Sequence, residues 1–179
     1  MDNDFSALKK QQANLAQLLT KPLQQLQTTD AHLAFIAPEQ LLEHRATLIR
    51  KRSQQTAEIL PRVRRGLGKQ FEPLFRDFAN QHHFNSVEAN RLDAIHFTRW
   101  LEQKSLSIPW LICCCRFERT RSEWEKANSW YCKFILLKYD IHSWETTADS
   151  PNKKATAWLF ANSGSLHRVW HWPRRNLNR

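Results

Sequence analysis

Apolar residues recur at three- and four-residue intervals over the first two-thirds of the chain, a spacing that places them on one face of an α-helix. Prolines mark predicted helix starts at Pro38, Pro61 and Pro109, because the fixed φ of proline suits a first helical turn. Gly68 marks a predicted end, because glycine readily adopts the left-handed conformation at which helices stop. The predicted helices span residues 4–20, 38–60, 61–67, 69–82, 87–103 and 109–126.

Each predicted helix has one apolar face that we expect to point into a common core. Along residues 38–60 this face includes Arg45, and the opposite face is basic. Asn85 and Ser86 are suitable N-caps for residues 87–103, and Glu88 completes a capping box. The predicted core-facing residues are Phe5, Leu8, Leu15, Leu19, Leu41, Leu42, Leu48, Ile49, Ile59, Leu60, Phe71, Leu74, Phe75, Phe78, Leu92, Ile95, Phe97, Trp100, Leu101, Trp110, Cys113, Cys114, Phe117 and Trp124.

After residue 128 the pattern changes to aromatic and branched residues, which favour strands. Residues 131–144, 154–160 and 166–172 are three predicted extended runs, separated by polar turns. The predicted fold class is therefore α+β, with an N-terminal multi-helix bundle followed by a small C-terminal antiparallel sheet. We expect a helical domain over residues 1–127 and a β-rich unit over residues 128–179 packed on it.

The longest apolar run, residues 108–115, is far shorter than the ~20 residues that a membrane span needs. The first residues are acidic rather than basic and then apolar, unlike a signal peptide. We therefore expect a soluble, cytoplasmic protein without a membrane partner. Its oligomeric state is not determined by the sequence.

Four cysteines stand at positions 113, 114, 115 and 132, a pattern unlike a disulfide framework. Consecutive helical residues diverge by about 100°, so Cys113, Cys114 and Cys115 would not aim at one ion. The sequence also lacks the CxxC pair that many zinc sites use. We interpret the cysteines as small apolar core residues and expect neither a metal nor a cofactor.

The net charge of +10 and the pI near 9.8 indicate an acidic partner, and nucleic acid is the usual one. Between Arg45 and Lys69 there are eight basic residues and one acidic residue, Glu58. The alternative is a solvated helix face whose arginines pair with carboxylates elsewhere. The predicted phosphate contacts are Arg50, Arg52, Arg62, Arg64, Arg65 and Lys69, flanking a turn that resembles a helix-turn-helix connection.

Six tryptophans lie between residues 124 and 172, with basic residues among them. We expect most of them to form the core of the small sheet. Trp170 and Trp172 alternate with Arg168 on one strand face and are the predicted exceptions, able to stack on bases or to contact a peptide. These three residues are the predicted partner-binding residues.

We find no catalytic motif in the sequence and expect that the protein is not an enzyme. Ser53, Ser86 and Ser163 lie in no nucleophile elbow, and no glycine-rich phosphate loop is present. The carboxylates fit helix-surface or capping roles; they are Asp77, Glu88, Asp93, Glu118, Glu123 and Glu125.

Residues 6–20, 60–81, 92–103 and 109–125 together resemble a family of bacterial proteins of unknown function that are labelled as DNA-binding domain proteins. The resemblance rests on Leu60, Pro61, Leu67, Gly68, Phe71, Leu74, Phe75, Phe97, Leu101, Trp110, Leu111 and Glu118. Relatives in that family include non-enzymatic partner subunits of methanobactin-type peptide-modifying complexes. The resemblance implies a helical domain followed by a small mixed domain. The run of Ile112 and three cysteines, and the basic residues before Pro61, depart from the family pattern.

The leading hypothesis is a non-enzymatic helical module that binds nucleic acid through the basic helix face, without strong sequence specificity. The alternative is a protein- or peptide-binding accessory subunit that uses the tryptophan-rich C-terminal sheet, for example by adding a strand to it.

Overall fold

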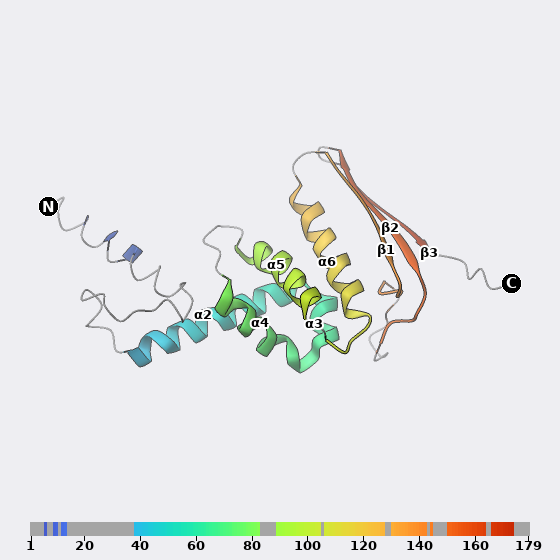
Figure 1. Cartoon of the computed structure of the whole chain (residues 1–179). Helices are drawn as coiled ribbons and strands as arrows, with labels where there is room; N and C mark the ends of the chain where they lie inside the picture. Colours follow the sequence, from blue (N-terminus) through green and yellow to red (C-terminus); the bar gives the residue numbers. More distant parts are fainter. Residues whose placement is uncertain are drawn as a thin grey trace.

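The computed structural model describes residues 6, 9–10, 12–13, 38–82, 89–104, 106–127, 130–142, 144, 150–163 and 166–173. Five helices precede a three-stranded sheet in this part of the chain (Figure 1). They are α2 (Pro38–Ile59), α3 (Pro61–Leu67), α4 (Phe71–Gln81), α5 (Ala89–Gln103) and α6 (Leu111–Lys126), with a short 3₁₀ turn, η3 (Gly68–Gln70), before α4. The strands are β1 (Tyr131–Leu137), β2 (Thr156–Ser163) and β3 (Leu166–Pro173).

This arrangement confirms the predicted α+β fold class. Pro61 stands in the first turn of α3, and Gly68 ends that helix with a φ of 51°. Helix α6 begins at Leu111, two residues later than predicted. The predicted helix 4–20 and the caps Asn85, Ser86 and Glu88 lie outside the described residues, apart from residues 6, 9–10 and 12–13, which are helical.

Aromatic rings fill the space between α4 and α5. Phe71, Phe75 and Phe78 recur on one face of α4, and all three are buried against Phe97 of α5. The ring centroids of Phe75 and Phe97 lie 5.2 Å apart at 74°, an edge-to-face geometry that aromatic pairs favour. The helical face that the sequence predicts for α4 is therefore confirmed.

Helix α6 lies between the other helices and the sheet (Figure 1). The side of α6 that faces the sheet places the Phe117 ring 4.8 Å from that of Trp158, edge to face. Trp124 donates its indole N–H to the carbonyl of Ala161 at 2.9 Å. The buried residues of both layers form one continuous hydrophobic cluster.

The sheet has the strand order β1-β2-β3, and both pairs are antiparallel. In its central row, Phe134 of β1 is paired with Leu159 of β2, which is paired with Trp170 of β3. Directly paired residues point to the same face of an antiparallel sheet. The neighbouring residues Trp158 and Phe160 point the other way and are buried against α6.

The predicted apolar face of α2 is partly wrong. Leu42 and Leu48 are exposed, whereas Ser53 and Thr56 are buried along with the predicted Arg45. The buried stripe of this helix is therefore largely polar. A hydrophobicity pattern does not register such a stripe. In the described part of the chain, no helix is both long and apolar enough to cross a bilayer.

Candidate functional site

Arg52, a predicted phosphate contact, joins α2 to α5. Its guanidinium contacts both carboxylate oxygens of Asp93, with Nη2–Oδ1 at 2.7 Å and Nε–Oδ2 at 2.9 Å. The Asp93 side chain has no exposed surface. Arg52 also donates to the carbonyl of His82 at 3.4 Å and lies over the Phe75 ring. Its donors are thus used inside the fold.

Arg62 makes a second internal ion pair, with Glu118 of α6. The backbone N–H of Arg62 donates to Oε1 of Glu118 at 3.1 Å, and Nη1 of the same arginine lies 3.4 Å from that oxygen. Arg62 Nε donates to the carbonyl of Ile141, and its guanidinium lies 4.8 Å from the centroid of the Phe117 ring. Arg62 thereby joins α3 to α6 and to the segment after β1.

Glu118 is the buried centre of this network. Its other carboxylate oxygen, Oε2, lies 3.0 Å from Nη2 of Arg121. Burial raises the pKa of Glu118 above its ordinary value, and the charges of Arg121 and Arg62 oppose that rise. The expectation that Asp93 and Glu118 occupy helix surfaces or caps is therefore wrong: both are buried partners of arginines distant in sequence.

Arg65 is held by the segment that follows β1. Its Nη1 donates to the carbonyl of Trp144 at 2.9 Å, and its guanidinium lies 4.2 Å from the centroid of the Trp144 ring. That ring in turn meets Trp110 edge to face at 4.5 Å. Arg65 therefore acts as a contact between α3 and the residues that lead to β2.

The remaining predicted cations are open to solvent. Arg50, Arg64 and Lys69 are exposed, as is Lys51, and none has a side-chain hydrogen bond or ion pair with another described residue. Arg64 and Lys69 border an open hollow of about 670 Å³ beside Glu58. The basic stretch is thus divided: Arg52, Arg62 and Arg65 stabilise the fold, and the others present charge outward.

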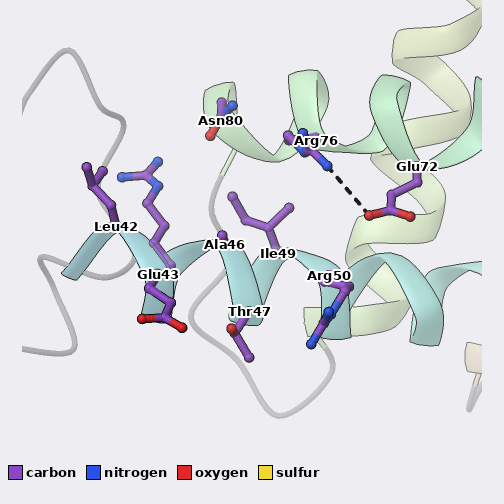
Figure 2. A pocket seen from close by; sticks show the side chains of 10 residues that line it. Leu42, Glu43, Ala46, Thr47, Ile49, Arg50, Glu72, Arg76 and Asn80 are labelled. Carbon is purple, nitrogen blue, oxygen red and sulfur yellow. Dashed lines mark ion pairs between the residues drawn. The ribbon is translucent and has the colours of Figure 1, made fainter. Parts of the chain in front are cut away.

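A second hollow, of about 570 Å³, lies between α2 and α4 (Figure 2). Ile49 points from α2 toward α4, whereas Arg50 points away from α4. Glu72 and Arg76 of α4 pair across one helical turn at 3.6 Å. Glu43 adds a further carboxylate to the lining. Charges of both signs line this hollow, so it offers no clear preference for an acidic or a basic ligand.

The outward face of the sheet carries three of the large apolar residues that are exposed in the described part of the chain. Phe134 is 57% exposed, Leu136 is 52% exposed and Trp170 is 36% exposed. The register places all three on the face opposite α6, with Leu159 between Phe134 and Trp170. The predicted exposure of Trp170 is confirmed.

Two other predicted partner-binding residues share this face by register. Arg168 is paired with Ala161, and Trp172 is paired with Ala157. The side chains of Arg168 and Trp172 lie outside the described part of the structure. Trp130, which directly precedes β1, is 77% exposed. The sequence offered no signal for it, because a tryptophan before a strand is as compatible with burial as with exposure.

A smaller groove of about 360 Å³ runs between the first half of α6 and the end of β1. Pro109, Ile112, Leu136 and Ala155 form most of its apolar lining. The groove also includes two exposed cations, Arg116 and Lys138, described further below.

The cysteines separate into two environments. Cys113, Cys114 and Cys115 are buried, whereas Cys132 is exposed on the outward face of the sheet. Burial raises the pKa of Cys114 and of Cys115 well above the ordinary thiol value, so neither is an activated nucleophile. In the part of the chain that the structure describes, no group of three or more His, Cys, Asp or Glu residues could hold a metal ion.

Residues 35–103 match the family model of the SCO6045-like C-terminal domain. The match spans α2 to α5 and ends before α6 and the sheet. The comparisons with curated proteins and with solved structures found no match. The family description gives neither a ligand nor an activity, so DNA binding and the methanobactin-type relationship stay predictions.

Proposed function

We propose that the chain is a non-enzymatic binding module that receives a protein partner on the outward face of its sheet. The supporting observation is the exposure of Phe134, Leu136 and Trp170 on one face. An antiparallel sheet with one solvated face normally alternates between apolar residues toward the core and polar residues toward water. Here most of the outward positions are apolar as well, and such an exposed apolar face supports the proposal of an interaction surface.

The residue types on this face also favour a protein partner. Aromatic side chains are enriched in protein interfaces, where they often contribute much of the binding free energy. Ala157 and Ala161 of β2 leave room between the flanking strands, and Phe134 and Trp170 stand in the row between them. The Phe134–Leu159–Trp170 row therefore stands between two alanines of the central strand, where side chains of a partner could pack.

Co-purification from the native host tests this proposal. We expect a stoichiometric protein partner that resists moderate salt, accompanies the wild-type chain and is lost from a Phe134→Ser/Trp170→Ser variant. Leu42→Ser is the matched control, because Leu42 is similarly exposed but lies on α2. A partner retained equally by all three chains, or removed equally by both changes, contradicts the proposal.

A second candidate function is nucleic-acid binding through the helical layer. The net charge of +10 favours it, and so do the exposed side chains of Arg50, Lys51, Arg64 and Lys69, for which the described residues provide no hydrogen-bond or ion-pair partner. In this second candidate function, fewer cations are available to contact phosphates than the sequence predicts, since Arg52, Arg62 and Arg65 have partners within the fold.

Duplex binding over a salt series tests the second candidate. Each lost phosphate contact lowers the slope of log K against log salt by about 0.9, so Arg64→Gln/Lys69→Gln should lower it by about 1.8. Lys153→Gln/Lys154→Gln removes the same charge from the loop before β2 and should leave the slope nearly unchanged. Equal slopes for the two variants would exclude the helical layer as the contact surface.

A further inference from the structure

The groove between α6 and the end of β1 has an unbalanced charge. Its lining includes Arg116 and Lys138 and no carboxylate. Both cations are exposed, and neither side chain has a hydrogen bond or ion pair with another described residue. The two other hollows include carboxylates in their linings, Glu43 and Glu72 in one and Glu58 in the other, whereas the lining of this groove has two cations and no carboxylate.

The same groove has an exposed apolar surface between its cations. Ile112 and Arg116 are four residues apart on α6 and therefore lie on one face of the helix. Ile112 is exposed, and so is Leu136 on β1, where the groove meets the apolar outward face of the sheet. A ligand seated here buries apolar groups against Ile112 and Leu136 and places negative charge beside Arg116 and Lys138.

We propose that this groove binds a short acidic peptide segment of the partner, with an apolar side chain between Ile112 and Leu136 and carboxylates beside Arg116 and Lys138. The inference rests on the proposed function, because the groove continues the outward sheet face at Leu136. It specifies that the partner's segment is acidic and carries an apolar side chain, which the sheet face alone does not indicate. A volume of about 360 Å³ is at the lower end of the range for ligand pockets and suits a side chain with its flanking groups.

Fluorescence anisotropy with defined peptides tests the proposal. The probe is a short fluorescein-labelled peptide in which leucine and phenylalanine alternate with glutamate. Its comparison peptides replace glutamate with glutamine, or the apolar residues with serine. We expect the acidic apolar peptide to bind at least about fivefold more tightly than either comparison peptide, the effect that two partly exposed charge pairs produce.

Variants then locate the site. Arg116→Gln/Lys138→Gln should abolish the preference for glutamate over glutamine. Folding should be unaffected, because both side chains are exposed and have no partner in the described part of the chain. Arg64→Gln/Lys69→Gln removes equal charge from the helical layer and should leave the preference intact. If both double variants reduce the preference equally, the effect is that of net charge alone, and the proposal is wrong.

Two further outcomes separate this proposal from the proposed function. If no acidic peptide binds while the natural partner still requires Phe134 and Trp170, the groove proposal fails and the sheet-face proposal stands. A different result would come from an oligothymidine probe. If this probe binds and its binding requires Arg116 and Lys138, while the acidic peptide does not bind, the groove is a nucleic-acid site and the peptide proposal is overturned.

Discussion

The ion pair between Arg52 and Asp93 allows a direct test of whether Arg52 stabilises the fold, unlike the exposed arginines of the same stretch. Arg52→Met removes the charge and keeps most of the side-chain length, which leaves the Asp93 carboxylate buried without its cation. Asp93→Asn keeps the shape of the buried side chain and leaves the guanidinium without its anion. The two variants therefore disturb the same contact from opposite sides.

The two variants should lose different amounts of stability, because Asp93 is more deeply buried than Arg52. Asp93 has no exposed side-chain surface, so removing Arg52 should lower the free energy of unfolding by about 3–5 kcal/mol. The Arg52 side chain is 22% exposed and can turn its guanidinium toward water, so Asp93→Asn should cost about 1–3 kcal/mol. The double variant should cost about 2 kcal/mol less than the sum, since the residues contact each other.

Urea denaturation followed by tryptophan fluorescence measures these free energies, provided that the slopes of the transitions stay equal. Arg50→Met is the matched control, because Arg50 is exposed on the same helix and has no side-chain partner among the described residues; it should change stability by no more than about 0.5 kcal/mol. Equal costs for Arg52→Met and Arg50→Met would refute the assignment of Arg52 as a structural residue.

Three further outcomes follow from the buried groups. Because burial raises the folded-state pKa of Glu118, protonation of its carboxyl adds stability that is lost as the pH rises above the ordinary glutamate range and through that raised pKa; Glu118→Gln should flatten this fall in the urea midpoint, and an unchanged pH dependence would contradict this. Gly66→Ala should destabilise the fold by about 1–3 kcal/mol, because its Cβ would lie 2.7 Å from Cη2 of Trp110. Gly68→Ala should also cost about 1–3 kcal/mol although its Cβ meets open space, because a φ of 51° with a ψ of −124° is a backbone conformation that residues other than glycine rarely adopt; an unchanged thermal midpoint for either variant would contradict the corresponding reason. In the native protein, Ellman's reagent should titrate the thiol of Cys132 rapidly and those of the other three cysteines only after unfolding; rapid reaction of more than one thiol would show that the others are accessible.

The helices and strands were predictable because their signals are local. The prolines at positions 38 and 61 and the glycine at position 68 act on the backbone around them, whatever the rest of the chain does. The alternation along β1 similarly follows from one face packing on α6. The register between strands was not predictable, so the apolar outward face could be anticipated only at Trp170.

The roles of the arginines were not predictable because their partners are distant in sequence. Asp93 lies 41 residues after Arg52, and Glu118 lies 56 residues after Arg62. Neighbouring residues of identical type, such as Arg64 and Arg65, differ only in what the fold brings near them. One cue was available: Asp93 and Glu118 each stand within an otherwise core-facing stretch of helix, where a carboxylate requires a cation.

The position of α6 decides where this chain can be shortened. A fragment ending near residue 127 would leave Phe117 and Trp124 facing water, because both rings pack against β2. It would also remove the carbonyls of Ile141 and Trp144, which accept hydrogen bonds from Arg62 and Arg65. Expression boundaries placed between α6 and β1 should therefore yield aggregating products, and crystallisation or mapping work on either layer needs the segment through β3.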